Sequence, residues 1–543
     1  MIQKMILYFL WVASSLTICE AQESPKLVPT PKKYTSAKGY FTFNQETAII
    51  LPDENEELRW AVQPLIECFH KASNLPLPIN YDKKSKRNVI ICSLISQITN
   101  QEGYHLSIKA DAIHIEASTP SGIFYAIQTL RQLLPHAIEK DQKSNDIIWK
   151  IPCAEISDKP EFAYRGFMLD VGRHFMPVDF VKRCIDFAVF HKMNKFHWHL
   201  TEDQGWRIEI KKYPKLTSVG AYRNMTLKNH LRDSVHQWKT ERYGGYYTQE
   251  EIREVVDYAR RHFVEVIPEI EIPGHALAAL AAYPEYSCSG GPFEVGTKWG
   301  IFEDIFCSRE ETFGFLENIF DEVINLFPSQ YIHIGGDEAP RVRWQRCHAC
   351  QQRIKEHNLK NEAALQTYFL NRIGDYLGKK GKKVIGWDEV IEGGIPKDAT
   401  VMVWRDDKWV NEATRQGHDV IWTPSSHYYL NVPQGKISEE PMGPLRSITL
   451  EKTYQFQPIR KTYSAEQIKH IKGVQANLWT EYIATPKHLE YMIAPRLAAV
   501  AETAWRNPTK KDFKAFYVRL KQLLLHYEAM GINYSHSFNE SKL

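Results

Sequence analysis

The chain has 543 residues, of which 43% are apolar and 24% charged, as in an ordinary soluble globular protein. Its 68 basic and 65 acidic residues give a formal net charge of +3, so electrostatics offers no reason to expect a nucleic-acid partner. The length exceeds that of one ordinary domain and favours a large domain with a smaller companion.

The N-terminal residues 1–21 have the pattern of a secretory signal. One lysine precedes an apolar run from Met5 to about Ile18, which is too short for a comfortable membrane span. We expect cleavage after Ala21. Cys19 offers a second option, lipid attachment, although the isoleucine before it fits a lipoprotein processing site poorly. Either route predicts an exported protein, periplasmic, secreted or anchored to an outer membrane, in which disulfides can form.

Residues 25–158 have the pattern of a small α+β domain. The segment LVPTPKKY opens it in an extended form, and NVIICSLI and AIHIEAS are typical of strands. SGIFYAIQTLRQLLP carries apolar residues at roughly helical spacing. No catalytic constellation is visible in this part of the chain.

The sequence pattern changes at Tyr164, after which short apolar runs alternate with amphipathic helical stretches. One of these helices opens with Thr248 and Glu251 in capping-box spacing. The alternation predicts an α/β fold, a (β/α)8 TIM barrel over residues 159–530, with a C-terminal tail over 531–543. The eight expected strands are 167–173, 195–203, 264–275, 331–338, 383–389, 400–405, 419–424 and 473–481.

Polar and aromatic residues gather at the carboxyl ends of these expected strands. In a barrel those ends converge on one face, where active sites lie. The acid pair in YIHIGGDEAP would alone be compatible with a surface turn, but many such strand ends together favour a site. They are Arg173, Glu202, Asp203, His275, Asp337, Glu338, Trp387, Trp404, Trp479 and Glu481.

Acids, an arginine, a histidine and many tryptophans suit glycoside hydrolysis, since indole faces pack on sugar rings. Most glycosidases use two carboxylates that flank the scissile bond. Asp337 and Glu338 are neighbours in the chain, which is awkward for that arrangement. The pattern therefore indicates the exception in which the substrate supplies its own nucleophile.

Several ordered motifs resemble glycoside hydrolase family 20, the β-N-acetylhexosaminidases. They are RGFMLDVGRHF, FHWHLTEDQGWR, PEIEIPGH, HIGGDE, GWDE and QANLWTE, and LVPTPKKY is similar to the start of that family's non-catalytic N-terminal domain. The resemblance implies an exo-acting, retaining, substrate-assisted enzyme without a cofactor. The 2-acetamido oxygen of a terminal β-linked GlcNAc or GalNAc attacks the anomeric carbon and forms an oxazolinium ion.

The resemblance also implies a role for each matching residue. Glu338 matches the general acid and base, and Asp337 the carboxylate that holds the acetamide N–H. His275 matches a histidine that links the general acid to a further carboxylate, here Glu202. The other matches bind the sugar: Arg173 and Glu481 at its hydroxyls, Trp387, Trp404 and Trp479 as aromatic walls, and Tyr429 at the acetamide carbonyl.

Three positions depart from the family pattern. Glu202 and Glu271 stand where aspartate is usual, and Asn431 in YYLN stands where many members have aspartate. The two glutamates keep the charge and add a methylene, so we expect the geometry to adapt. Loss of the anion at Asn431 leads to the hypothesis that 6-sulfated GlcNAc is tolerated.

The chain contains nine cysteines, eight of them after the signal region. Cys288 and Cys307 flank a loop rich in glycine and aromatic residues, for which we predict a disulfide. Cys347 and Cys350 form CHAC, which fits a redox or metal site, a small local disulfide, or two free thiols. A zinc site would need a second ligand pair, and none stands out in the sequence.

Three alternative functions remain at this stage. A catalytically inactive glycan-binding protein would keep Arg173 and the tryptophan walls but lose the acid. A metal-dependent amidohydrolase would use His197 and His199, with His275 and Asp337, and would lose activity to a strong chelator. A glycosidase with a protein nucleophile would also accept glucosides that lack the acetamido group. The natural glycan and the oligomeric state are not fixed by the sequence.

Overall fold

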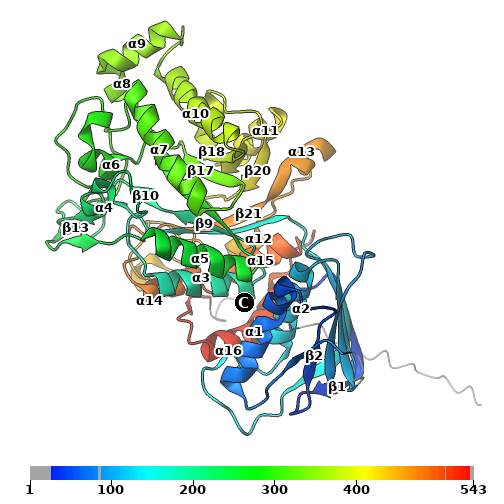
Figure 1. Ribbon diagram of the computed structural model, residues 1–543. Coiled ribbons are helices and arrows are strands. Elements are labelled where there is room, and N and C mark those ends of the chain that lie inside the picture. Colours follow the sequence, from blue (N-terminus) through cyan, green and yellow to red (C-terminus); the bar gives the residue numbers. More distant parts are fainter. Residues whose placement is uncertain (1–25, 83–86, 508, 539–543) are drawn as a thin grey trace, which may run out of the picture.

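The computed structural model describes residues 26–82, 87–507 and 509–538 (Figure 1). The predicted signal and Cys19 therefore lie outside the described residues, as does the end of the predicted tail. Within the described ranges, no helix is both long and apolar enough to span a membrane.

The N-terminal domain is a seven-stranded mixed sheet with α1 and α2 on one face (Figure 1). The predicted strands over NVIICSLI and AIHIEAS are confirmed as β4 and β6, and the predicted helix as α2. The strand order is β1-β7-β5-β6-β4-β2-β3. The bounds are β1 Lys33–Thr42, β2 Ala48–Ile50, α1 Glu56–Ala72, β3 Ile79–Asn80, β4 Val89–Leu94, β5 Tyr104–Ile108, β6 Ala112–Ala117, α2 Pro120–Leu133, η1 His136–Glu139 and β7 Lys150–Asp158.

The second domain is the predicted barrel, closed by eight parallel strands in the order β16-β17-β18-β19-β20-β21-β8-β9. Each of the eight expected apolar runs supplies one strand, so the fold prediction is confirmed. The strands are β8 Tyr164–Asp170, β9 Lys195–His199, β16 Glu265–Ile272, β17 Tyr331–Gly335, β18 Lys383–Trp387, β19 Thr400–Val403, β20 Asp419–Trp422 and β21 Ile471–Leu478.

Helices follow the barrel strands and cover them from outside (Figure 1). The main ones are α3 Val178–Phe190, α5 Gln249–Arg261, α7 Glu310–Leu326, α10 Glu362–Lys379, α11 Asp407–Arg415, α13 Ala465–His470 and α15 Arg496–Trp505. The loops add α4 Lys215–Ser218, α6 Leu277–Ala282, η2 Pro284–Tyr286, α8 Val342–Arg346, α9 His348–Glu356, η3 Asp388–Glu392, η4 Ile437–Glu439, α12 Leu450–Gln455, α14 Pro486–Ile493 and, after the barrel, α16 Phe513–Ala529. Short two-residue strands in the first long loop are β10 Thr201–Glu202, β11 Gly205–Trp206, β12 Tyr222–Arg223, β13 Thr226–Leu227, β14 Trp238–Lys239 and β15 Tyr243–Gly244.

Helix α5 shows how local sequence fixes a helix start. The Thr248 hydroxyl accepts a hydrogen bond from the Glu251 backbone N–H at 3.2 Å. The Glu251 carboxylate accepts one from the Thr248 backbone N–H at 2.8 Å. This is the predicted capping box, which satisfies two N–H groups that have no partner inside the helix.

Buried ion pairs join the two domains at the end of the barrel opposite the carboxyl ends of its strands. Arg165, fully buried at the start of β8, donates to both carboxylate oxygens of Glu102 at 2.6 and 2.9 Å. Lys192 lies 3.2 Å from Asp158, which also accepts from the Trp505 indole at 2.9 Å. The N-terminal domain is thereby fixed to the barrel floor and lies away from its mouth.

The predicted disulfide between Cys288 and Cys307 is not formed. All eight cysteines in the described ranges are free. Cys307 Sγ instead lies 3.6 Å from Cys347 Sγ and 3.7 Å from Cys350 Sγ. The prediction failed because sequence spacing related each cysteine only to its neighbours in the chain, whereas the fold brings the CHAC pair back to the loop.

Candidate active site

The paired acids follow β17 through two glycines whose missing side chains are structurally required. Gly335 has φ +66°, and a Cβ there would lie 1.7 Å from Oε2 of Glu271. Gly336 has φ +94°, and a Cβ there would lie 2.4 Å from Val390. A turn this crowded admits only glycine, and it carries the chain into Asp337 and Glu338 at the strand end.

All the predicted catalytic and substrate-binding residues line one cavity of about 220 Å³ at the carboxyl ends of the strands. The structure thus brings together side chains that are far apart in the sequence. The lining residues are Arg173, Glu202, His275, Asp337, Glu338, Trp387, Trp404, Tyr429, Asn431, Pro444, Arg446, Trp479 and Glu481.

His275 lies between the paired acids and a second pair of carboxylates. Its Nε2 is 3.6 Å from Glu338 and 3.8 Å from Asp337, and its Nδ1 is 3.1 Å from both Glu202 and Asp203. Burial alone lowers the pKa of His275, but Glu202 and Asp203 outweigh it and raise the pKa well above its ordinary value. The ring is therefore an imidazolium that faces the acids. His275 and Glu338 both have positive φ, +48° and +43°, a backbone form that functional sites often retain.

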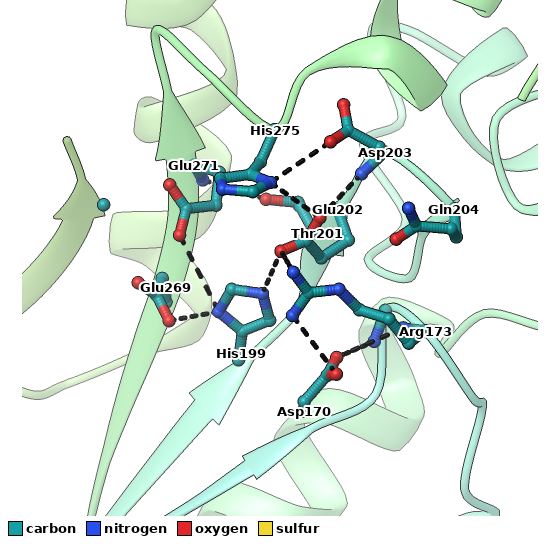
Figure 2. A network of polar contacts seen from close by, with 12 residues as sticks. Asp170, Arg173, His199, Thr201, Glu202, Asp203, Gln204, Glu269, Glu271 and His275 are labelled. Atoms are coloured by element: carbon teal, nitrogen blue, oxygen red, sulfur yellow. Dashed lines mark hydrogen bonds and ion pairs between the residues drawn. The ribbon is translucent and has the colours of Figure 1, made fainter. Parts of the chain in front are cut away.

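Glu202 is the centre of the polar network beneath the pocket (Figure 2). Its Oε1 lies 2.5 Å from Arg173 Nη2 and 3.2 Å from His199 Nε2. Its Oε2 lies 3.1 Å from His275 and accepts from the Asp203 backbone N–H at 2.9 Å. Burial opposes ionisation, but Arg173 and His275 hold the pKa of Glu202 below its ordinary value. The longer glutamate side chain thus has a complete set of donors.

Asp337 is the less exposed member of the acid pair, with 13% of its side chain exposed against 36% for Glu338. Burial raises the pKa of Asp337 to about 7, with His275 opposing the shift and the neighbouring Glu338 adding to it. Within the described part of the chain its Oδ1 is buried and has no hydrogen-bond partner. Most buried polar atoms are paired, so this oxygen marks a place for a ligand donor.

Aromatic rings form the walls. Trp387 and Trp479 have ring centroids 5.7 Å apart, and Trp479 and Tyr429 are 6.1 Å apart. Trp404 stacks near Tyr429 at 6.2 Å and 22°. The indole Nε1 atoms of Trp387 and Trp479 are buried without an acceptor among the described residues. The pocket therefore offers apolar faces with polar edges, which suits a polyhydroxylated ring.

Arg173 and Glu481 lie at one side of the cavity. Arg173 contacts Asp170 at 3.4 Å as well as Glu202, and its guanidinium lies 5.1 Å from the Trp479 ring centre. Burial raises the pKa of Glu481, although Arg173 opposes the shift. Glu481 Oε2 is another buried atom that lacks a partner in the described structure.

Sequence reasoning missed three residues of the site. Pro444 and Arg446 line the cavity from the loop between η4 and α12, far along the connection after β20, so their distance from that strand end gave no signal in the sequence. Glu389 accepts from the Trp404 indole at 3.0 Å and fixes that wall. Burial, reinforced by Asp337, raises the pKa of Glu389 to about 9. The GWDE motif contained Glu389, but nothing in its spacing showed that it holds Trp404.

The two histidines of HWH point at a carboxylate inside the barrel. His197 Nε2 lies 3.0 Å from Glu269, His333 Nδ1 lies 2.7 Å from it, and His199 Nδ1 also contacts it. His197 Nδ1 lies 3.0 Å from the Gln475 amide. These contacts engage both HWH histidines within the protein, as part of the barrel interior rather than of the pocket lining.

Comparisons with known proteins agree with this geometry. Residues 162–508 match the family model described as "Glycosyl hydrolase family 20, catalytic domain", and residues 24–159 match its "domain 2". The chain is 40% identical over 527 residues to a β-hexosaminidase of Porphyromonas gingivalis, covering 96% of this chain but 66% of that relative. The chain thus spans about two thirds of that curated relative's length.

Solved structures show the same fold. A GH20 β-N-acetylhexosaminidase from Streptomyces coelicolor A3(2) superposes with a TM-score of 0.82 at 30% identity, covering 94% of this chain and 97% of that one. A mutant Streptomyces plicatus β-hexosaminidase in complex with product GlcNAc gives a TM-score of 0.82 at 31% identity, covering 94% and 96%.

Proposed function

The chain belongs to glycosyl hydrolase family 20, and from that premise we propose that it is an exo-acting, retaining β-N-acetylhexosaminidase. Its substrates would be glycans that end in β-linked GlcNAc or GalNAc. The observation that carries the proposal is the unpartnered, buried Asp337 oxygen beside Glu338 in an aromatic-walled cavity. The S. plicatus relative binds GlcNAc as its product, which supports the class of sugar.

In the proposed mechanism the substrate supplies the nucleophile. Glu338 gives its proton to the glycosidic oxygen while the acetamido oxygen attacks the anomeric carbon, and the bond to the leaving group breaks. Asp337 accepts the acetamide N–H and stabilises the positive charge that develops on the oxazolinium ring. The Tyr429 hydroxyl donates to the acetamide oxygen. Glu338 then takes a proton from the water that opens the ring, and the anomeric configuration is retained.

His275 suits a positioning role in this scheme. Its cation lies within 4 Å of both acids and is itself held by Glu202 and Asp203. It favours the ionised form of Asp337 against the effect of burial. It therefore helps one acid of the pair to remain an anion while the other exchanges a proton.

Exo action is supported by the size of the cavity. About 220 Å³ is below the range of about 300–1,000 Å³ that drug-sized ligands occupy. One sugar ring is the unit that such a space suits, with the rest of the glycan outside. We therefore expect single residues to be released from the non-reducing end.

Tolerance of 6-sulfated GlcNAc is a finer part of the proposal. Asn431 is neutral where many family members carry an acid, and Arg446 lines the same cavity. A cation near an uncharged amide favours an anionic substituent. We expect Asn431→Asp to lower turnover of a 6-sulfated aryl GlcNAc at least tenfold while the plain sugar is little affected. Undetectable activity of the wild type on the sulfated sugar, beside strong activity on the plain one, would end the hypothesis.

We also propose that the protein is exported, on the pattern of residues 1–21. Mass spectrometry of the mature N-terminus tests it: a start just after Ala21 indicates a cleaved signal, and a lipid-modified Cys19 indicates an anchor. An intact N-terminus in a protein confined to the cytosolic fraction would contradict export.

The deciding experiment is hydrolysis of an aryl β-GlcNAc by the wild type, Glu338→Gln and Asp337→Asn, beside an aryl β-glucoside. We expect only the acetamido sugar to be cleaved. Each variant should lose about 10²–10⁴-fold in kcat, the usual range for a general acid or a charge-stabilising group. Asp375→Asn, on the exposed face of α10, is the matched control and should keep full activity.

Comparable turnover of the glucoside would mean that the protein supplies the nucleophile. No turnover of either sugar would favour a glycan-binding protein.

A further inference from the structure

Four cysteines from three separate segments meet beside the barrel mouth. Cys288 Sγ lies 3.7 Å from Cys350 Sγ, and Cys307 Sγ lies 3.6 Å from Cys347 and 3.7 Å from Cys350. All four sulfurs fall within 4.8 Å of one another. We propose that Cys288, Cys307, Cys347 and Cys350 bind one structural zinc ion.

The sulfur separations match the geometry of such a site. Zinc holds thiolates at about 2.3 Å, so the sulfurs of a regular ZnS₄ tetrahedron are about 3.8 Å apart. The three measured distances, 3.6 to 3.7 Å, are close to that edge length. Cys307, Cys347 and Cys350 are buried and Cys288 is half-buried, so the site is closed, as structural zinc sites are.

Disulfides explain the arrangement less well. Cys307 is almost equally far from Cys347 and Cys350, and Cys350 is equally far from Cys288 and Cys307. No pairing is preferred, and every separation is far above the S–S bond length of about 2.05 Å. Four sulfurs arranged around a common centre are what one tetrahedral ion requires.

The backbone around the cluster is built to hold it. Ser287 and Phe306 form an antiparallel bridge, and the Cys307 N–H donates to the Tyr286 carbonyl at 2.8 Å, which sets Cys288 and Cys307 side by side. Cys347 immediately precedes α9 and Cys350 lies in its first turn. Thiolates at a helix N-terminus are stabilised by the helix dipole.

The ion would clamp two loops that border the catalytic acids. Residues 288–307 belong to the loop after β16, and the Gly296 N–H in that loop donates to the carbonyl of Asp203 at 2.8 Å. Helix α8 follows the Asp337–Glu338 pair, and its Trp344 donates to the Phe306 carbonyl at 2.9 Å. The zinc would therefore connect two segments. One is the loop that contacts Asp203, a carboxylate partner of His275, and the other is the segment that carries Asp337 and Glu338.

Metal analysis of the full chain tests the proposal. The wild type, purified under reducing conditions without chelator, should contain close to one equivalent of zinc, and X-ray absorption should give four sulfurs at about 2.3 Å. Cys350→Ala should lose the metal. Cys184→Ala, which removes a buried thiol from α3 outside the cluster, should keep it. Cys288→His, at the most exposed position, should retain zinc, because imidazole replaces thiolate in many zinc sites.

Removal of the ion should lower the thermal midpoint of the wild type and of Cys184→Ala, and leave that of Cys350→Ala unchanged. If Cys350→Ala does not fold, the metal content and absorption spectrum of the wild type decide alone. The proposal is overturned if the reduced wild type binds no zinc at equimolar supply or holds iron instead. It is equally overturned if peptide mapping finds these cysteines joined as disulfides in the native protein. The activity assay with Glu338→Gln is independent of these outcomes, so failure of the zinc proposal leaves the proposed reaction standing.

Discussion

Replacement of Glu202 by glutamine tests whether the negative charge of Glu202 stabilises the polar network beneath the pocket. The carboxylate accepts from Arg173, His199 and His275 and from the Asp203 backbone. An amide keeps one acceptor oxygen and turns an NH2 group either toward Arg173 and His199 or toward His275 and the Asp203 backbone N–H. Breaking a buried ion pair by removing one partner costs about 3–5 kcal/mol. Arg173 keeps Asp170 at 3.4 Å and His275 keeps Asp203 at 3.1 Å, so we expect the lower end, about 3 kcal/mol.

The assay is urea denaturation followed by tryptophan fluorescence, together with kcat/KM on an aryl β-GlcNAc. Glu202→Asp is the matched control, because it keeps the charge and loses only reach, for which we expect about 1–2 kcal/mol. Activity of Glu202→Gln should fall with stability, since Arg173 and His275 lose their common anchor. A Glu202→Gln variant within about 0.5 kcal/mol of the wild type would refute the reasoning, because a surface substitution behaves that way.

Three further predictions concern the turn, the acid pair and the domain junction. Gly335→Ala should abolish activity and lower the thermal midpoint, since its Cβ would lie 1.7 Å from Glu271 at φ +66°. The acidic limb of kcat/KM should lie near pH 7, because the proposed mechanism uses the anion of Asp337 and burial raises the pKa of Asp337 to about 7, so activity is lost as pH falls through that value. Arg165→Ala should destabilise the protein by about 3–5 kcal/mol, because it leaves Glu102 without its cation, while kcat/KM at 25 °C stays unchanged.

Each of these has a result that would contradict it. Gly381→Ala is the control for the turn: it has φ +77° but open space around the Cβ, so it should cost only about 1–2 kcal/mol and leave activity intact. If Gly335→Ala and Gly381→Ala lost stability and activity to the same extent, the expected clash with Glu271 would be contradicted. An acidic limb below pH 5 would contradict the raised pKa of Asp337. A normal thermal midpoint in Arg165→Ala would mean that the junction is held by other contacts.

The fold and most of the pocket followed from the sequence because both are encoded by local pattern. Each barrel strand was a short apolar run, and the residues at its carboxyl end necessarily share one face. That reasoning placed Arg173, His275, Asp337 and Trp479 in one cavity, where the structure has them. The capping box of α5 is likewise a short-range signal and was read correctly.

The features that the sequence did not predict are contacts between loops. Arg446 reaches the cavity from a segment with no strand end to mark it. The cysteine cluster forms only where a loop meets a helix that follows it in the chain after all of α7, β17 and α8. Spacing in the chain suggested the nearer partner, a disulfide between Cys288 and Cys307, and could not show that CHAC supplies the second pair. Such contacts between distant residues depend on loop conformation, which cannot be predicted from the hydrophobic periodicity of the sequence.

The junction at the barrel floor also sets an order of events during synthesis. Arg519, on α16, donates to the backbone carbonyl of Leu27, 492 positions earlier, and α16 packs against η1 of the N-terminal domain. At about 5–20 residues per second, the ribosome needs about 25–100 s to make the intervening chain. The first domain therefore emerges long before the helix that covers part of it. Until Leu523 and His526 of α16 arrive, the part of the N-terminal domain around Leu134 and His136 stays open to water, to chaperones and to other nascent chains.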